Sequence, residues 1–156
     1  MKHFVGIGEM AISNQLEDSL ITHALASCVG VTIYVPRLHV GGMIHVALPN
    51  RMVHSDIQYK SGYYADIGMP LFIRRFQEDY GCQLKDMDVR LFGGARSINQ
   101  SDVFNIGKRN ILAVEEILRA YGIPYDHTET GATISRTIEL SISDGQVTMS
   151  TQRIRI

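Results

Sequence analysis

The sequence predicts an α+β fold, in which mixed or antiparallel β-sheets form a sandwich-like arrangement covered by two or three helices. Two observations support this fold class. The β-rich segments outnumber the helical ones, and the two kinds do not alternate regularly as in a doubly wound parallel sheet. The chain has 156 residues, 45% hydrophobic and 20% charged, so it can bury a core without disulfides. We therefore expect residues 1–156 to form a single domain.

The β-rich segments group into two predicted hairpins and one further strand. The first hairpin turns at Pro36-Arg37. The second is C-terminal and turns at Asp144-Gly145, a dipeptide typical of a two-residue type I′ turn. The expected strands are residues 28–35 and 43–48 around the first turn, 89–92 between the hairpins, and 137–143 and 146–151 around the second turn.

Two helices are expected from apolar residues at helical spacing. The clearer helix covers about residues 107–121, with Asn105 as its N-cap and Gly122 as its stop signal. The other helix covers about residues 67–80. That range places Pro70 in the first turn, where a missing backbone N–H is tolerated.

The charge and hydropathy of the chain limit its partners. Its 15 Lys and Arg residues and 16 Asp and Glu residues give a net charge of −1. Without a basic field, we expect no binding to nucleic acid or to an anionic membrane surface. No stretch approaches the roughly 20 apolar residues that span a bilayer, and the N-terminus lacks the apolar core of a signal peptide. The sequence predicts a cytoplasmic protein that is not embedded in a membrane.

The cysteines and histidines do not have the spacing of a metal site. Cys28 and Cys82 are the only cysteines, and they form no C-x-x-C motif. The 6 histidines include no i, i+4 pair on a predicted helix. We therefore expect no metal ion, and each cysteine must be judged as a thiol.

The first predicted hairpin brings Cys28 close to His45. Alternation from Val29 onward gives the first strand a β-branched core face, so Cys28 points to the opposite face. A turn centred on Pro36-Arg37 pairs Val29 with Ile44 and Cys28 with His45. Directly opposed Cβ atoms lie about 4.5–5.5 Å apart, so the thiol and the imidazole would meet.

A thiol beside an imidazole is a candidate nucleophile with its base. The thiolate is the reactive form, and a free cysteine with a pKa of about 8.5 is only slightly ionised at neutral pH. Glycines at positions 30, 41 and 42 would leave open space for a substrate near the pair. The alternative is structural: a cysteine entering a strand is commonly a small buried hydrophobe, and a strand histidine is commonly just hydrogen-bonded.

Gly6-Ile7-Gly8-Glu9-Met10-Ala11 fits the G-x-G-x-x-A form of a dinucleotide-binding fingerprint. The strand before it is short, no helix is expected after it, and no acidic residue ends the next strand. We therefore expect a tight β-turn at this position and no nucleotide.

Several specific blocks of sequence follow one another along nearly the whole chain. They are Gly6-Ile7-Gly8-Glu9, Thr22 with Leu25-Ala26-Ser27-Cys28-Val29, Gly42-Met43-Ile44-His45-Val46-Ala47-Leu48-Pro49, Tyr64-Ala65-Asp66, Phe92-Gly93-Gly94-Ala95 and Asn105-Ile106-Gly107-Lys108-Arg109-Asn110. Together these blocks resemble the CheD family of chemoreceptor glutamine deamidases. Two departures stand out, Ala26 where the family commonly has glycine and His23-Ala24 where it usually has Leu-Gly.

The resemblance implies a protein-glutamine deamidase with a Cys/His/Thr site carried onto Cys28, His45 and Thr22. Its substrates would be glutamines in the cytoplasmic helices of methyl-accepting chemoreceptors, converted to glutamate with release of ammonia during chemotaxis adaptation. We expect a thioester on Cys28 and an oxyanion held by backbone N–H groups near Ser27 and Cys28. Thiol and imidazole supply the chemistry, so no cofactor is expected.

Two other functions stay open at this point. The family includes members that bind a CheC-type phosphatase of the response regulator, so the chain could be a non-catalytic module that binds such a phosphatase or a receptor. It could also be an amidase of small molecules. A binding module would tolerate loss of the Cys28 thiol, whereas either enzyme would not.

Overall fold

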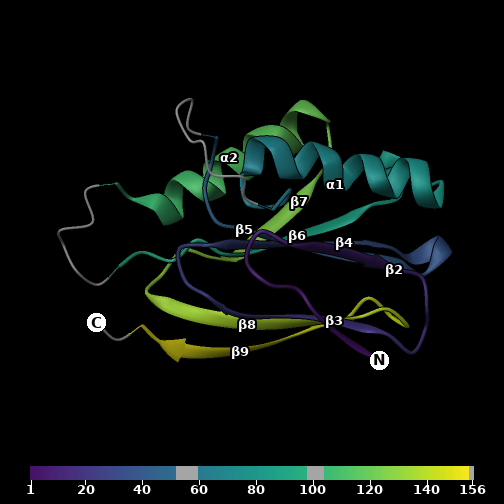
Figure 1. Ribbon diagram of the computed structural model, residues 1–156, viewed down its shortest axis with the longest axis horizontal. Helices are drawn as coiled ribbons and strands as arrows, with labels where there is room; N and C mark the ends of the chain where they lie inside the picture. The colour runs from purple at the N-terminus through teal and green to yellow at the C-terminus, as the bar shows by residue number, and fades with distance from the viewer. Residues whose placement is uncertain (52–59, 98–103, 155–156) are drawn as a thin grey trace.

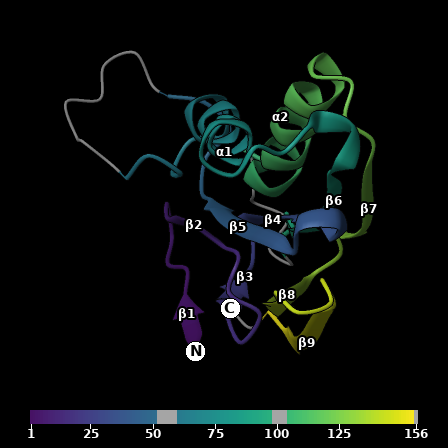
Figure 2. The same ribbon diagram turned by 90° about the vertical axis from the view of Figure 1, so that its right-hand side faces the viewer.

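The computed structural model describes residues 1–51, 60–97 and 104–154, which pack as three layers. Helices α1 (Ala65–Tyr80) and α2 (Ile106–Ala120) form the upper layer in Figures 1 and 2. A five-stranded sheet forms the middle layer and a four-stranded sheet the lower layer. The α+β class predicted from the sequence is confirmed.

Both sheets are mixed. The middle sheet has the strand order β2-β5-β4-β6-β7 and is antiparallel except for the pair β6 and β7. The lower sheet has the order β1-β3-β8-β9, and only β1 and β3 are parallel. The strands are β1 (Lys2–Phe4), β2 (Met10–Ser13), β3 (Ser19–Leu25), β4 (Val29–Val35), β5 (Val40–Val46), β6 (Asp88–Gly93), β7 (Tyr125–Thr130), β8 (Ile134–Ser141) and β9 (Val147–Arg153), with 3-10 helices η1 (Pro36–Leu38) and η2 (Leu84–Asp86).

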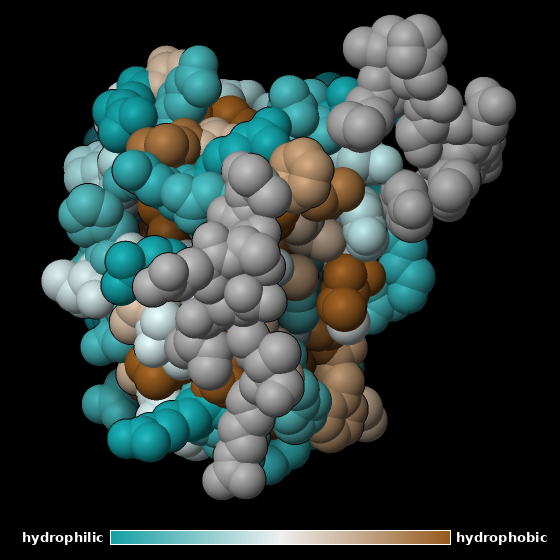
Figure 3. All heavy atoms as spheres, turned by 90° about the vertical axis from the view of Figure 1, so that its left-hand side faces the viewer, coloured by the Kyte–Doolittle hydropathy of each residue, from teal (hydrophilic) through white to brown (hydrophobic). Residues whose placement is uncertain are grey.

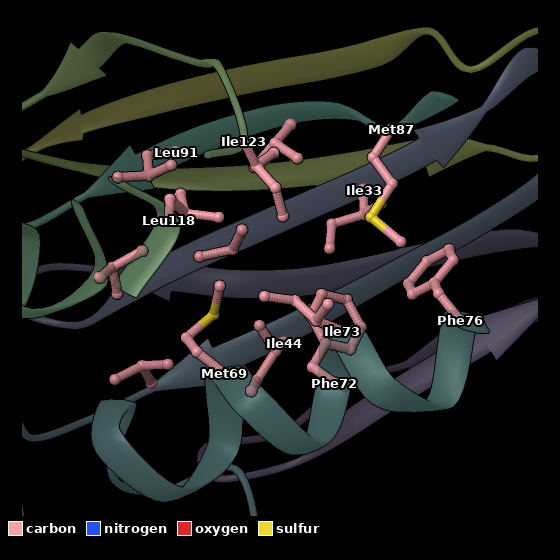
Figure 4. Packing of buried hydrophobic residues seen from close by; sticks show 14 of the residues in the cluster. Ile33, Ile44, Met69, Phe72, Ile73, Phe76, Met87, Leu91, Leu118 and Ile123 are labelled. Atoms are coloured by element: carbon pink, nitrogen blue, oxygen red, sulfur yellow. The ribbon is translucent and has the colours of Figure 1, made fainter. Parts of the chain in front are cut away.

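Two hydrophobic cores lie on the two faces of the middle sheet. The larger core fills the space between this sheet and the helices, and Figure 4 shows Ile33 and Ile44 of the sheet packed with Met69, Phe72 and Ile73 of α1. The smaller core lies between the two sheets. Its buried members are Val5, Leu20, Leu25, Met43, Phe92, Ile138, Leu140 and Ile142.

Burial on both faces fits the sequence of β4. Its odd-numbered valines and Ile33 belong to the core on the helix side, which confirms the predicted β-branched face. The glycines do not leave open space, however. A Cβ at Gly30 would lie 2.8 Å from Leu25 of the lower sheet, and one at Gly42 would lie 2.7 Å from the Phe76 ring of α1. The expectation of open space for a substrate at Gly30, Gly41 and Gly42 is wrong, because side chains of the adjoining layers fill that space.

The two predicted helices are present, and α1 begins earlier than predicted. It starts at Ala65, so the prediction that Pro70 lies in the first turn is wrong, and Pro70 is inside the helix. The earlier start has a reason, since the N–H groups of Ala65 and Asp66 donate to the carbonyl oxygens of Leu48 and Pro49. The bounds of α2 agree with the prediction within one residue, and its N-cap position is Asn105 as expected.

The β4–β5 hairpin has a register two residues away from the predicted one. Gly30, and not Cys28, lies opposite His45. The connection is longer than a two-residue turn because Pro36–Leu38 forms a 3-10 helix and His39 follows it in the left-handed conformation, with φ 51°. A shift of two residues leaves every side chain on its predicted face of the sheet.

The C-terminal hairpin is confirmed, but its predicted type I′ turn is wrong. Residues 142–146 connect β8 and β9, instead of Asp144-Gly145 alone. The longer connection follows from Ile142, whose side chain is buried between the sheets and whose N–H donates to the Asp18 carbonyl at 3.1 Å.

A bulge in β3 places a non-glycine residue in an unfavourable conformation. The register of β3 against β8 shifts between Thr22 and Leu25. Within the bulge Ala24 has φ 52°, and its N–H donates to Thr137 Oγ1 at 3.0 Å. The left-handed region costs a residue with a Cβ about 1–2 kcal/mol, a penalty that glycine escapes. Ala24 is also one of the two departures from the family pattern, which usually has glycine there.

We predict that Ala24→Gly raises the free energy of unfolding by roughly 0.5–1 kcal/mol, because relief of the left-handed strain outweighs the extra freedom of glycine in the unfolded chain. Urea unfolding of both proteins measures this. Ala113→Gly, in the regular part of α2, is the matched control and should lower stability by up to about 1 kcal/mol. A loss of stability in both variants would contradict the prediction.

Candidate active site

The candidate site lies where the chain passes from the lower sheet to the middle sheet. β3 ends at Leu25 and β4 begins at Val29, so residues 26–28 cross between the layers. Cys28, at the end of this crossing, packs against the core between the sheets and is partly exposed. Figure 3 shows the molecule from this side, where hydrophobic and hydrophilic side chains mix on the described surface.

His45 and Thr22 belong to different sheets and are hydrogen-bonded to each other. Thr22 Oγ1 on β3 lies 2.7 Å from His45 Nδ1 on β5. The same hydroxyl donates its proton to the Val5 carbonyl oxygen at 2.6 Å. Because a hydroxyl has one proton, Thr22 can only accept from His45. Nδ1 therefore carries the imidazole proton, and the free lone pair is on Nε2.

The lone pair on Nε2 is unused. Nε2 is buried and has no hydrogen-bond partner in the part of the chain that the structure describes. His45 is 3% exposed and Thr22 is 1% exposed. An unpaired buried polar atom costs about 1–3 kcal/mol, so such an atom calls for a functional explanation. A role of Nε2 as a proton acceptor in a reaction is one such explanation.

Cys28 and His45 lie on the same face of the middle sheet, as the alternation predicts. They are not directly opposed, because His45 pairs with Gly30 and Cys28 precedes Val29, the first paired residue of β4. Because His45 Nε2 has no hydrogen-bond partner among the described residues, no hydrogen bond joins it to Cys28 Sγ in this structure. The predicted register of the hairpin was wrong, but the predicted side-chain face of Cys28 and of His45 was right.

Burial controls the ionisation of both groups. Burial lowers the pKa of His45 to about 4, and burial raises the pKa of the Cys28 thiol above its ordinary value. Each shift favours the neutral form of its group. At neutral pH the resting pair is therefore a thiol with a neutral imidazole, and not a thiolate–imidazolium ion pair.

The loop that carries Cys28 is fixed through its carbonyl groups. The Ala26 carbonyl accepts from the N–H of Ala95 at 2.7 Å, and the Cys28 carbonyl accepts from the N–H of Gly94 at 2.8 Å. The Ser27 carbonyl between them accepts from a side-chain amide of α2 at 2.9 Å. The N–H groups of Ser27 and Cys28 have no acceptor among residues 1–51, 60–97 and 104–154. These two donors are available to a ligand.

The first turn of the chain holds the backbone of His45. The N–H of Gly8 donates to the His45 carbonyl at 2.8 Å, and the N–H of His45 donates to the Glu9 carbonyl at 3.0 Å. A bond from the N–H of Glu9 to the Gly6 carbonyl closes the turn, in which Gly8 has φ 78°. The β-turn predicted in place of a nucleotide-binding loop is confirmed.

Three features of the site carried no role in the sequence prediction. The Val5 carbonyl is a backbone group that no side-chain pattern reveals. Gly93 was named only within a block of the family resemblance, and a Cβ there would collide with the Cys28 carbonyl. Asn110 lies on the buried side of α2 together with Gly107 and Val114, and a polar residue in that apolar stripe is the signal that could have marked it.

The described residues contain neither a cluster of metal ligands nor a helix that could span a membrane. Within them no three His, Cys, Asp or Glu side chains converge as ligands. Neither helix of the described ranges combines the length and apolarity needed to cross a bilayer.

The chain matches one family model and several named proteins over most of its length. Residues 47–151 match the family model described as CheD chemotactic sensory transduction. The chain is 40% identical over 149 residues to the probable chemoreceptor glutamine deamidase CheD of Syntrophotalea carbinolica, covering 94% of this chain and 91% of that protein. It is 37% identical over 150 residues to the protein of the same name from Desulforamulus reducens, covering 94% and 89%. The corresponding protein CheD 1 of Syntrophus aciditrophicus is 34% identical over 144 residues, covering 92% and 89%.

A solved structure supports the fold. The crystal structure of Bacillus licheniformis hypothetical protein YfiH matches 78% of this chain with a TM-score of 0.52 and 11% identity. The match spans 51% of that protein, about half of its length. At this identity the likeness concerns the arrangement of helices and strands alone.

The depressed pKa of His45 predicts a stability that falls in acid. Between pH 6.5 and about 4 the unfolded chain binds a proton on this imidazole and the folded chain does not, so the free energy of unfolding decreases as the pH decreases. The full effect is about 3 kcal/mol, at roughly 1.4 kcal/mol per pKa unit. Urea unfolding across this range should show the component in the wild type and not in His45→Gln. The same pH dependence in both proteins would contradict it.

Proposed function

The chain belongs to the CheD family, and we propose that it hydrolyses glutamine side chains of bacterial chemoreceptors to glutamate and ammonia. One observation carries the proposal. The hydrogen bonds from Thr22 to Val5 and from His45 to Thr22 leave a free base at Nε2, on the face of the sheet that also carries Cys28. The names of its relatives as probable chemoreceptor glutamine deamidases support the substrate.

The reaction begins with proton transfer from Cys28 Sγ to His45 Nε2. The thiolate sulfur then attacks the carbon of the glutamine carboxamide, and a C–S bond forms while the carbonyl π electrons move to oxygen. The N–H groups of Ser27 and Cys28, which have no acceptor in the described structure, stabilise that oxyanion. The imidazole is unprotonated at neutral pH, so its Nε2 lone pair is free to accept this proton.

Hydrolysis completes the cycle. The protonated His45 gives its proton to the departing nitrogen, so that the C–N bond breaks and ammonia leaves a thioester on Cys28. His45 then removes a proton from water, which attacks the thioester and releases glutamate and the free thiol. Thr22 keeps the imidazole in the required tautomer throughout, as an acceptor for Nδ1–H.

The family resemblance supports a specific substrate region on the receptor. We propose that the glutamines belong to the helices of the receptors' cytoplasmic region, which places the chain in the cytoplasm. The new carboxylate changes the charge of a receptor helix by one unit, and charge at helix surfaces affects helix packing. A CheC-type phosphatase is a second proposed partner, carried by the family resemblance.

Loss of either member of the dyad should abolish turnover. Incubated with a receptor cytoplasmic fragment, the wild type should release ammonia and raise the fragment mass by about one dalton per site, whereas Cys28→Ala and His45→Ala should lower the rate at least about 1000-fold, because removal of one member of a catalytic unit disables the whole. Intact-mass spectrometry and an ammonia assay measure both.

Cys82→Ala is the matched control, since Cys82 is buried on the helix side of the middle sheet. Stoichiometric binding of the fragment without ammonia release from the wild type would favour the interaction module. Release from free glutamine or short amides alone would favour a small-molecule amidase.

Two variants of Thr22 distinguish control of the His45 tautomer from packing. Thr22→Val keeps the volume but removes the acceptor of Nδ1–H, so we expect kcat to fall by about 100-fold or more as the imidazole loses its fixed tautomer. Thr22→Ser keeps the hydroxyl and should stay within about tenfold of the wild type. Steady-state ammonia release is the measurement, and equal activity of the two variants would rule out the assigned role.

A further inference from the structure

Helix α2 contributes one buried side chain that no step of the proposed reaction uses. Asn110 is 0% exposed, and its Nδ2 donates to two carbonyl oxygens, that of Ser27 at 2.9 Å and that of Ala47 at 3.0 Å. The first carbonyl belongs to the loop that carries Cys28. The second directly follows β5, the strand that carries His45. One amide group therefore bridges the two segments that hold the candidate nucleophile and base.

The bridge lies where the ladder between β4 and β5 stops. Val29 and Val46 form the last backbone pair at this end. Beyond them the N–H of Ala47 donates to the Tyr63 carbonyl at 2.9 Å and not to the nucleophile loop. Beyond the last pair, the Asn110 amide joins the two segments through the carbonyls of Ser27 and Ala47, where no backbone hydrogen bond of the ladder does.

The chemistry of this bridge requires an amide. Two carbonyl oxygens are both acceptors, so a group that joins them directly must donate two hydrogens, and the side-chain NH2 of asparagine does so without adding a charge. Asn110 Oδ1 is meanwhile buried without a hydrogen-bond partner in the described part of the chain. Such an unpaired acceptor is unfavourable by about 1–3 kcal/mol, so packing alone does not explain an asparagine at this position.

We propose that Asn110 is a positioning residue that sets the separation of the Cys28 thiol and the His45 imidazole. Cys28 directly precedes Val29 and His45 directly precedes Val46, the last pair of the ladder, so any splaying of β4 from β5 there changes the distance between the two side chains. A misplacement of about 1 Å can lower a rate by about 100-fold. This effect on turnover rests on the proposed function, whereas the effect on thiol reactivity does not.

The first test compares two isosteric exchanges on the same helix. Asn110→Asp replaces the double donor by acceptors, and we expect kcat for the receptor fragment to fall by about 100-fold with KM within about threefold. Glu115→Gln is the matched control, because Glu115 is buried on α2 but contacts Tyr125 and His127 of β7. It should keep kcat within about threefold of the wild type.

A second readout needs no receptor. The pH profile of Cys28 alkylation by iodoacetamide, followed by peptide mass to separate it from Cys82, depends on His45 if the two groups are coupled. Asn110→Asp should reproduce the profile of His45→Ala, whereas Glu115→Gln should keep that of the wild type. If the wild type released no ammonia, the proposed function would fail, and the alkylation profile would still decide the role of Asn110.

A milder variant keeps the test decisive if Asn110→Asp does not fold. Asn110→Ser keeps a donor and adds no charge, so it is less disruptive than Asn110→Asp and should show the same changes in smaller degree. The proposal is overturned by a folded Asn110 variant with wild-type kcat and alkylation profile. It is also overturned by a loss of kcat no larger than that of Glu115→Gln, or by a rise in KM alone.

Discussion

The middle sheet is covered on both faces, and most features of the site follow from this constraint. The helix face of β4 and β5 is filled by β-branched side chains, so polar groups of these strands can point only into the space between the sheets. His45 does so and finds its partner in the other sheet, Thr22. The same enclosure lowers the pKa of the imidazole, because burial disfavours its charged form.

The proposed nucleophile, Cys28, must combine access with a base held in place, and it lies at the crossing between the sheets. Residues 26–28 lie outside the ladders, which leaves Cys28 partly exposed and its loop free to present N–H groups. Order comes instead from contacts to the carbonyls of that loop. Gly94, Ala95 and Asn110 supply them from two different elements. The loop is thus held through its carbonyl groups, while Cys28 stays partly exposed.

The sequence was informative about side-chain faces and uninformative about register. Alternation of polar and apolar residues assigned Cys28 and His45 to one face correctly, because burial acts on each residue independently. Both hairpins were nevertheless displaced by two residues, since their connections depend on tertiary contacts. Ile142 is drawn into the core between the sheets, and the chain after Val35 forms a 3-10 helix. Local turn propensity does not contain either contact.

Thr22 illustrates a second limit of sequence reasoning. Only the family resemblance pointed to it, because its partner lies in another sheet and no short-range pattern relates the two. Asn110 stands out locally as a polar residue in an apolar helix stripe, but its two partners, the carbonyls of Ser27 and Ala47, do not follow from any local pattern. Local pattern predicted both helices and the strands β4, β5, β6, β8 and β9 within a few residues, but not β1, β2, β3 or β7. The side-chain hydrogen bonds of Thr22, His45 and Asn110 are long-range and appear only with the packed layers.

The residues of the site lie far apart along the chain, between Val5 and Asn110. This separation determines when during folding the site can form. Contacts of such long range form late in folding, after the entropy of closing large loops has been overcome. Until then Cys28 is an ordinary thiol, with no oriented base and no organised donors. Under the proposed function, a nascent or partly unfolded chain therefore cannot attack the glutamines around it, its own included, because the proposed centre exists only in molecules that have completed their fold.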